Sequence, residues 1–428
     1  MTASLLLENV TCLGCGCACD DIGVTVRDGR IVDAHNACAL GARWFGDGSV
    51  PSLCRVDGRD EPLAVAMTHS AHVLRAATRP LVYLVPGLSC ESQRQAAAVA
   101  DLLRARLDSV TSSTVRHAVL AGQEHGFASA TLGELRNRAD VVVFWGVDLA
   151  QRYPRFTSRY APDPVGVYVG GRQSRTVVAV DIEGATTIDD ADRRLTIASA
   201  DEIATLTALQ ALARARPDAP TLTSLASLPG AAWTTARELA PLLLSARYVA
   251  LVYDAEPDRR AERSGRRFEA LVSLSHALNE RTRCAAVALR AGGNRSGADS
   301  VLVAQTGYPF AVDFARGYPR YDPHDGAAAS ALQHSGVDVA LVVGDVTSVP
   351  GEIARGLPDV RCIVIGPRAS DSPLGTAAVV IDTGVDGIHA SGTAIRMDDV
   401  PLPLRASLSG PPTTATVLGG IGAAMARQ

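Results

Sequence analysis

Runs of apolar residues alternate with amphipathic stretches along most of the chain. The apolar runs have the length of β-strands and lie at 81–87, 141–146, 176–182, 247–253, 284–290, 339–345, 361–366 and 377–382. Helical periodicity lies between them, at 64–77, 91–107, 201–216 and 267–282. Continuous apolar strands that alternate with helices are typical of parallel sheets buried on both faces. The pattern therefore predicts an α/β fold with two parallel-sheet domains.

Both ends of the chain depart from this rhythm. Residues 4–10 and 22–33 are predicted strands, and Asp28-Gly29 inside the second stretch is a two-residue hairpin turn. Near the other end, 384–406 predicts a loop followed by a second β-hairpin. We expect this tail to return to the N-terminal unit.

These boundaries divide the chain into three predicted domains, with a Pro- and Ser-rich surface connection at 217–232. The domains are a small cysteine-rich β domain at 1–53, completed by 384–410; a first α/β domain at 54–115 with 330–383; and a second α/β domain at 116–329.

The first domain carries a cysteine framework. Five of the nine cysteines lie between Cys12 and Cys38. Cys12, Cys15 and Cys19 form C-x2-C-x3-C, and Cys38 supplies a distant fourth thiol, which suits a four-ligand iron–sulfur site. Structural zinc sites more often pair two C-x2-C units, so iron–sulfur is the better metal. The alternative is an empty cysteine-rich turn, and Cys17 fits no ligand position.

Composition excludes several classes of function. The formal net charge of −4 and the pI of about 6.2 do not indicate a nucleic-acid or membrane partner. The chain contains no lysine, which excludes Schiff-base lysines and Walker-type phosphate loops. The N-terminus has no basic leader, and no apolar run approaches the ~18–20 residues that span a bilayer. With clustered cysteines and no export signal, we expect a cytoplasmic protein.

Four long segments carry a resemblance to a known family. They are T-C-L-G-C-G-C-A-C-D-D-I (11–22), T-L-G-E-L-R-N-R-A-D-V-V-V-F-W-G (131–146), Q-T-G-Y-P-F-A-V-D-F-A-R-G-Y-P-R-Y-D-P (305–323) and S-G-T-A-I-R-M-D-D-V-P-L (391–402). In this order they resemble the B subunit of formylmethanofuran dehydrogenase, a short member of the molybdopterin oxidoreductase superfamily. The resemblance implies a small cluster domain and two α/β domains that hold a pterin cofactor, without the superfamily's C-terminal barrel.

The chain departs from this family at the metal-ligand position. In the redox enzymes, a cysteine or selenocysteine ligates tungsten or molybdenum and is followed by a histidine. The matching segment, S-S-T-V-R-H-A-V-L-A-G-Q-E-H-G, has Arg116 at the ligand position and keeps His117. A guanidinium stays protonated and has no lone pair to offer, so Arg116 cannot ligate a metal. The hydroxyls of Ser113 and Thr114 lie two or three residues away from that position.

A second departure follows the predicted strand at 141–146. The redox family tends to have G-x-N-P beside the pterin dinucleotide, whereas this chain has Gly146, Asp148 and Leu149 in G-V-D-L. A carboxylate that faces a pyrophosphate is repulsive unless a cation lies between them. We therefore expect no molybdenum or tungsten pterin. Without a pterin metal to receive electrons, an empty cysteine site is favoured over an iron–sulfur cluster.

Other candidate residues have structural explanations as well as functional ones. His117 and His125 resemble active-site histidines by position, but a hydrogen-bonded buried histidine is the commoner case. Glu134, Arg136 and Arg138 predict an ion network. Gly146, Gly292, Gly293 and Gly344 end strands on the side where α/β folds bind ligands. The aromatic- and arginine-rich segment at 305–323 suits an interface, a cavity wall or a core.

Because Arg116 replaces the metal ligand, the chain resembles more specifically the B subunit of the bacterial formyltransferase/hydrolase complex. That complex serves one-carbon oxidation in methylotrophs. That assembly transfers a formyl group from formyl-tetrahydromethanopterin to a methanofuran-type carrier and releases formate. A zinc amidohydrolase-type A subunit hydrolyses, a formyltransferase D subunit transfers, and a β-helical C subunit completes the set. The resemblance thus implies a catalytically silent structural role for this chain. Two alternatives stay open: a working molybdenum or tungsten oxidoreductase, and a metal-binding protein that acts alone.

Overall fold

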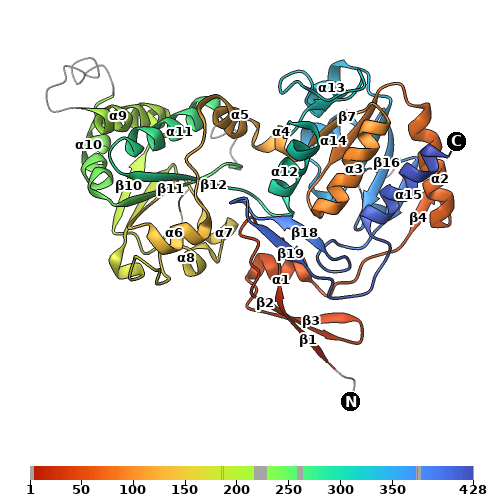
Figure 1. Cartoon of the computed structure of the whole chain (residues 1–428), viewed down its shortest axis with the longest axis horizontal. Coiled ribbons are helices and arrows are strands. Elements are labelled where there is room, and N and C mark those ends of the chain that lie inside the picture. Colours follow the sequence, from red (N-terminus) through yellow and green to blue (C-terminus); the bar gives the residue numbers. More distant parts are fainter. Residues whose placement is uncertain are drawn as a thin grey trace. The chain divides into compact units, whose positions relative to one another are not determined.

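The computed structural model divides the chain into two compact units (Figure 1). Unit 1 comprises Met1–Ser113 and Gly292–Gln428, and unit 2 comprises Thr114–Ala291. The structure describes residues 4–184, 186, 188–215, 229–257, 264–372, 374 and 377–427. Most of the connection predicted at 217–232 lies outside the described residues.

Unit 1 begins with the predicted hairpin. Three antiparallel strands form a small sheet: β1 (Leu5–Val10), β2 (Ile22–Arg27) and β3 (Arg30–His35). Asp28 and Gly29 both have positive φ, at 50° and 72°, as a two-residue type I′ turn requires. The chain then enters the short helix α1 (Ala39–Phe45).

A nine-stranded sheet forms the core of unit 1, in the order β14-β13-β7-β6-β15-β16-β17-β4-β5. Its central strands are parallel: β7 (Arg106–Ser109), β6 (Pro80–Leu84), β15 (Val339–Val343), β16 (Arg361–Gly366) and β17 (Val379–Asp382). Its outer strands are antiparallel: β13 (Val312–Asp313) and β14 (Arg320–Tyr321) at one edge, β4 (Cys54–Val56) and β5 (Arg59–Asp60) at the other. The strands β6, β15 and β17 are buried along their whole length because helices cover both faces of the sheet.

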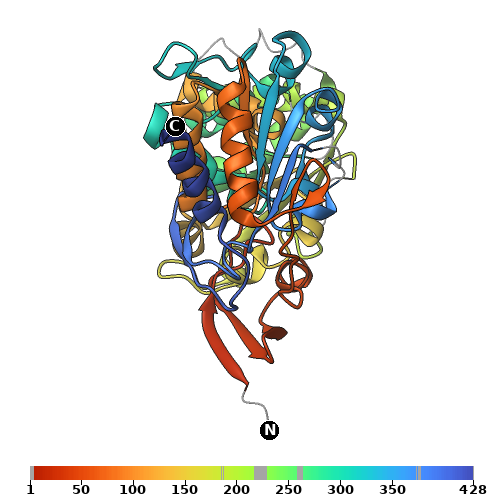
Figure 2. The ribbon, with the colours of Figure 1, turned by 90° about the vertical axis from the view of Figure 1, so that its right-hand side faces the viewer.

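Alternate residues of these strands pack into two separate apolar clusters. One cluster joins the sheet to α2 (Leu63–Ala76), α3 (Cys90–Leu102), α12 (Arg295–Thr306) and the C-terminal helix α15 (Thr414–Ala426). Figure 2 shows α15 beside α2, and α15 contacts α3 as well. The other cluster joins the opposite face to α13 (Ala328–His334) and α14 (Gly351–Gly356).

Unit 2 has a five-stranded, wholly parallel sheet in the order β10-β9-β8-β11-β12. The strands are β8 (Val141–Trp145), β9 (Thr176–Ile182), β10 (Arg193–Ile197), β11 (Tyr248–Asp254) and β12 (Arg283–Leu289). One face packs on α5 (Arg116–His125), α9 (Glu202–Arg214), α10 (Gly230–Ser245) and α11 (Gly265–Asn279). The remaining helices of the unit are α6 (Leu132–Arg138), α7 (Leu149–Arg152) and α8 (Phe156–Arg159).

Short helical segments complete the described residues. They are α4 (Val110–Thr114) and the 3-10 turns η1 (Arg172–Ser174), η2 (Ser199–Asp201), η6 (Val346–Ser348) and η7 (Ala369–Asp371). No helix in the described part of the chain is long and apolar enough to cross a membrane.

The predicted α/β class and the predicted parallel strands are confirmed, with two differences. The helix expected over 91–107 ends at Leu102, because Arg104 has φ 53° and turns the chain into β7. Residues 292–329, which the sequence pattern assigns to the second α/β domain, belong to unit 1 because β13 pairs with β7. That pairing is remote in sequence and leaves no local pattern.

The tail returns to the N-terminal part of unit 1, as expected. The strands β18 (Gly392–Ile395) and β19 (Pro401–Leu404) form its predicted hairpin. The Thr11 hydroxyl donates to the Pro403 carbonyl over 2.8 Å, and the Met397 amide donates to the Gly16 carbonyl over 3.4 Å. The tail therefore packs against the cysteine-bearing turn.

Main-chain segments stack closely at the carboxyl ends of β6 and β15. The Gly293 amide donates to the Leu13 carbonyl over 2.9 Å, and the Gly87 amide donates to the Gly293 carbonyl over 2.8 Å. Gly293 has φ 80°, and a Cβ added there would lie 2.4 Å from Pro86 Cβ. Only glycine combines this backbone conformation with so close an approach.

We expect Gly293→Ala to lower the free energy of unfolding of unit 1 by about 3 kcal/mol or more, because strain and a backbone collision add. Gly307→Ala is the matched control, since Gly307 has φ 86° but no atom within 4 Å of the added Cβ. It should cost about 1 kcal/mol. Urea unfolding of the two variants measures the difference, and equal losses would show that the close approach contributes nothing.

Candidate functional site

The predicted cysteine framework forms a buried turn between β1 and β2. Cys12, Cys15, Cys17 and Cys19 are buried, and Cys38 is half-buried. The Cys12 amide donates to the Cys19 carbonyl over 2.8 Å and closes the turn. The Gly14 amide donates to Cys12 Sγ over 3.3 Å, the kind of contact that lowers the charge on a ligand sulfur. All nine cysteines are thiols in the structure.

The four predicted ligands are neighbours. Burial raises the pKa of the Cys12 thiol above its usual range, and the nearby thiols of Cys15, Cys19 and Cys38 raise it further. A Cβ added at Gly41, in α1, would lie 3.2 Å from Cys12 Sγ and 4.0 Å from Cys38 Sγ. Sequence spacing therefore identified residues that the fold brings together.

The arrangement of the thiols is the test for an iron–sulfur cluster. The four side chains are of a ligand type that iron–sulfur clusters use, and the Gly14 amide suits a ligand sulfur. However, no three His, Cys, Asp or Glu side chains within the described ranges are placed to hold one metal ion. The framework thus has the ligand types of a cluster site without a converged ligand geometry.

The predicted metal-ligand position lies at the start of α5. Arg116 is the first residue of this helix and is half-buried, as is His117. A Cβ added at Gly265 would lie 3.6 Å from His117 Nδ1, so His117 faces the start of α11. His125 is exposed at the other end of α5, with Nε2 3.8 Å from Glu124 Oε2. The two histidines are therefore not brought into one site.

The residues after β8 have structural roles in unit 2. Gly146 has φ 59°, and an added Cβ would lie 3.2 Å from Arg267 Nη2. Asp148 Oδ1 accepts the Gln151 amide over 3.0 Å and caps α7. Leu149 is buried. Asp148 is thus a helix cap, and the sequence pattern that suggested a changed pterin loop is also a capping pattern.

Unit 2 has a topological switch point between β8 and β11, because the chain continues from these neighbours toward opposite edges of the sheet. Ligands of open α/β sheets bind at the carboxyl ends of such strands. Here the chain's own charges lie at that place. Arg152 Nε is 2.8 Å from Asp254 Oδ2, and the Arg152 guanidinium also donates to the Glu256 carbonyl over 2.8 Å.

This ion network continues to the next strand. Arg290 Nε lies 2.5 Å from Glu256 Oε1, and the Tyr153 hydroxyl donates to Asp254 Oδ1 over 3.3 Å. Burial raises the pKa of Asp254 to about 6, although the Arg152 guanidinium acts in the opposite direction. The sequence pattern did not single out these residues. Their signal was available, because Asp254 and Arg290 are the charged residues that follow two apolar runs.

A second buried ion pair lies at the end of β8. Arg267 Nε is 2.8 Å from Glu202 Oε1, with side chains 1% and 6% exposed. Trp145 Nε1 donates to the same carboxylate oxygen over 2.8 Å. Buried charges of this kind require partners, and here the partners come from the unit itself.

Unit 1 has its own switch point, between β6 and β15. The helix that follows β6 is α3, and Asp386 lies at its first turn. Asp386 Oδ2 accepts the Ser89 amide over 2.6 Å and the Ser92 hydroxyl over 2.7 Å. After β15, Asp345 Oδ1 accepts the Thr347 amide over 3.1 Å. A carboxylate of the chain therefore lies at the start of α3, and another caps the 3-10 turn η6.

These observations test the pterin dinucleotide that the superfamily implies. Such a cofactor is polyanionic and needs amide or cationic donors for its phosphates. Near the ends of β6, β8 and β15, the carboxylates of Asp386, Asp148 and Asp345 accept backbone amides of the chain, and the Arg152 guanidinium is engaged by Asp254 and Glu256. Burial raises the pKa of the Asp386 carboxyl, which is 2% exposed. The residues do not fit a polyanionic cofactor.

The chain is similar to two curated proteins over nearly its whole length. It is 30% identical over 421 residues to the B subunit of the tungsten-containing formylmethanofuran dehydrogenase 2 of Methanocaldococcus jannaschii. The aligned region covers 95% of this chain and 94% of the relative. It is 29% identical over 418 residues to the protein of the same name from Methanococcus maripaludis, with 95% of each chain covered. No family model matches the chain.

The fold is similar to a chain in the crystal structure of the formyltransferase/hydrolase complex (FhcABCD) from Methylorubrum extorquens in complex with methylofuran. The TM-score is 0.70 at 24% sequence identity, and the match covers 87% of this chain and 99% of that chain. An identity of 30% in an alignment that covers 95% of this chain establishes the kinship that the motifs predicted. The chain belongs to the family of the B subunits of formylmethanofuran dehydrogenase.

Proposed function

We propose that this chain is a non-catalytic structural subunit of a formyltransferase/hydrolase complex. The complex would move formyl from formyl-tetrahydromethanopterin to a methanofuran-type carrier and release formate in one-carbon metabolism. The observation that carries the proposal is Arg116, which stands at the start of α5 where the redox enzymes of the family have their metal-ligating cysteine or selenocysteine. A guanidinium cannot replace that ligand.

The packing of both switch points supports this proposal. In unit 2 the place of a ligand is taken by the ion pairs of Arg152 with Asp254 and of Arg290 with Glu256. In unit 1 the Asp386 carboxylate accepts the hydrogen bonds that a phosphate would accept at α3. A chain that completes its crevices with its own charges is suited to support other subunits rather than to hold a pterin.

The proposed partners are a zinc amidohydrolase-type A subunit, a β-helical C subunit and a formyltransferase D subunit. The similarity to a chain of the FhcABCD complex supports a hetero-oligomer of this kind. In this assembly the A and D subunits perform the chemistry, and the present chain supplies a docking face. Stable interfaces of this class bury about 2,000 Å² or more and are enriched in aromatic residues and arginine.

The alternative is a catalytic subunit of a molybdenum- or tungsten-pterin formylmethanofuran dehydrogenase. The names of both curated relatives favour it, since each is called tungsten-containing. The two functions differ in metal content, in pterin content and in the effect of changing Arg116.

The first prediction concerns metal content. Elemental analysis of the complex purified anaerobically from the native host should find no tungsten or molybdenum, and extraction should yield no pterin. We also expect colourless protein in which Cys12, Cys15, Cys19 and Cys38 react with a thiol reagent after mild unfolding.

Two outcomes would contradict these expectations separately. Near-stoichiometric tungsten or molybdenum would establish the oxidoreductase alternative. A brown colour that dithionite bleaches and that Cys12→Ser abolishes would show an iron–sulfur cluster in this chain. Cys284→Ser is the control, because Cys284 is a buried thiol of unit 2 that lies outside the framework.

The second prediction concerns assembly. Deletion of this chain should lower the abundance of the partner subunits and, with it, the formyl-hydrolysing activity, because an unpartnered docking face destabilises the subunits that it normally covers. Quantitative mass spectrometry of the partners in the deletion strain measures this effect. Unchanged partner abundance and unchanged activity would refute the structural role.

The third prediction concerns Arg116. Arg116→Ala, expressed in the deletion strain, should restore activity to within about a factor of two, a change below ~0.4 kcal/mol in the activation free energy. Arg116→Cys should not create formyl-linked redox activity, because the carboxylates that oppose a pterin are still present. A hundredfold loss of turnover for Arg116→Ala in an intact complex would instead give Arg116 a role in catalysis or substrate binding.

A further inference from the structure

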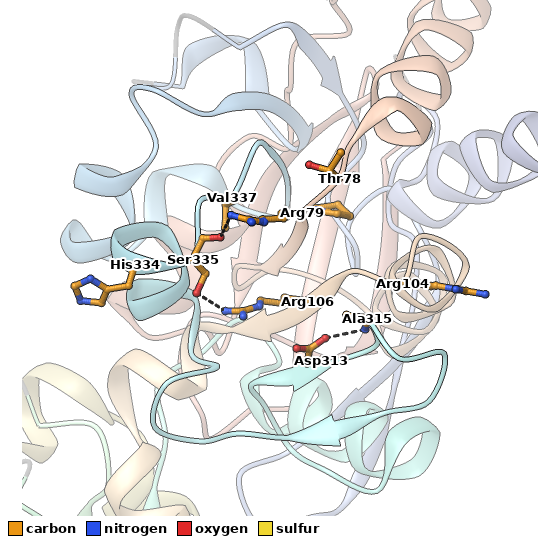
Figure 3. A pocket seen from close by; sticks show the side chains of 10 residues that line it. Thr78, Arg79, Arg104, Arg106, Asp313, Ala315, His334, Ser335 and Val337 are labelled. Carbon is orange, nitrogen blue, oxygen red and sulfur yellow. Dashed lines mark hydrogen bonds between the residues drawn. The ribbon is translucent and has the colours of Figure 1, made fainter.

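Unit 1 has a concave basic site at the amino-terminal edge of its large sheet, opposite the switch point. The cavity has a volume of about 450 Å³ (Figure 3). Arg79 directly precedes β6, and Arg106 is the first residue of the neighbouring parallel strand β7. Ser335 follows α13, and Asp313 pairs with Arg106 across β13 and β7. These four residues line the cavity together with Arg104 and His334.

Two guanidinium groups converge in this cavity. Arg79 Nη1 donates to the Ser335 carbonyl over 3.0 Å, and Arg106 Nη1 donates to the Ser335 hydroxyl over 3.1 Å. Figure 3 shows both side chains extending toward Ser335, whereas Arg104 and His334 point away from this pair. The loop after α13 therefore fixes the direction of Arg79 and Arg106 together.

Neither guanidinium forms an ion pair with a carboxylate that the structure describes. Among the described residues, no carboxylate oxygen lies within 4.0 Å of the Arg79 or Arg106 guanidinium nitrogens. The Asp338 carboxylate is close in sequence to Ser335, but it accepts the backbone amides of Thr78 and Arg79. These hydrogen bonds lower the pKa of Asp338 despite its partial burial.

The carboxylate that lines the cavity, that of Asp313, also accepts a backbone amide. Asp313 Oδ1 accepts the Ala315 amide over 2.7 Å, which orders the turn after β13. Three arginines therefore share a concave surface with one aspartate, on a chain whose formal net charge is −4. Charge of one sign in a cavity repels itself and attracts counter-ions of the other sign.

The donor pattern indicates the class of ligand. Each guanidinium has five N–H donors in a planar fork, and Arg79 and Arg106 each use one of them on Ser335. Two such forks from adjacent strands match an oxyanion with several acceptor oxygens, such as a phosphate or a carboxylate. The cavity volume is in the range of small-molecule sites, and polar side chains such as Arg79, Arg106 and Ser335 are part of its lining.

We propose that this cavity binds a small polyanion through phosphate or carboxylate oxygens, with Arg79 and Arg106 as its principal donors. The site is independent of the proposed function, because it lies at the opposite edge of the sheet from the switch point between β6 and β15. It does not require the chain to be silent or catalytic. Pyrophosphate and citrate are suitable probes, since they separate phosphate from carboxylate chemistry at similar size.

The test is calorimetric titration of the purified complex with each probe, at low and at physiological ionic strength. We expect binding of at least one probe, weakened by salt. Arg79→Gln and Arg106→Gln should each weaken it roughly tenfold. Asp313→Asn should strengthen it about two- to fivefold, because it removes the one carboxylate of the lining but keeps an acceptor for the Ala315 amide.

Arg237→Gln is the control, since Arg237 is exposed on α10 in unit 2 and should leave binding unchanged. The gain expected for Asp313→Asn cannot result from misfolding, so it protects the test against damaged variants. Absence of binding of both probes up to about 10 mM would overturn the proposal. So would binding that the arginine variants do not weaken. If these variants instead release a partner subunit and the complex binds neither probe, the arginines belong to an interface.

Discussion

The close stacking of main chain at the carboxyl ends of β6 and β15 is the constraint on which the cysteine-bearing turn depends. This turn has no helix or long strand of its own. It is held because the Leu13 carbonyl accepts the Gly293 amide, and the Gly293 carbonyl in turn accepts the Gly87 amide. Gly344 approaches the same place, with an added Cβ only 2.5 Å from the Val85 carbonyl oxygen. Gly293 and Gly87 therefore connect the cysteine-bearing turn to the end of β6 through main-chain hydrogen bonds.

Buried ion pairs are a second constraint, and they lie at the carboxyl ends of the strands of unit 2. A buried ion pair gains little net stability, but loss of one partner leaves an uncompensated charge in a poorly solvated place. Separation of Arg152 from Asp254, or of Arg267 from Glu202, would therefore destabilise the fold of unit 2. An anionic cofactor at the same strand ends would have to displace or outcompete these partners. The charges at these strand ends are thus paired with one another within the unit.

Sequence pattern was sufficient for the class of the fold, because the class depends on local and regularly spaced residues. It also identified cysteines that lie near one another, although no three of them in the described part of the chain are placed to hold one metal ion. Strand β9 lies where T-V-V-A-V-D-I predicted it, and Cys12 has the three expected thiols as neighbours. Long-range pairing was not predictable. The antiparallel contact of β13 with β7 joins residues about two hundred positions apart, so 292–329 was assigned to the wrong α/β unit. Asp148 shows a subtler limit, since one carboxylate can repel a phosphate or cap a helix, and only the structure places it on the Gln151 amide.

The two edges of the large sheet differ in a way that follows from the residues at the strand ends. At the carboxyl edge, Asp345 and Asp386 accept hydrogen bonds from backbone amides and hydroxyls of their own unit. At the amino edge, β6 and β7 begin beside arginines, and the nearest carboxylates, Asp338 and Asp313, are used by backbone amides. At both edges of the sheet, these carboxylates thus accept hydrogen bonds from backbone amides. No carboxylate in the described part of the chain forms an ion pair with Arg79 or Arg106. Because a guanidinium keeps its charge at any physiological pH, an external anion is the group that can neutralise these two side chains.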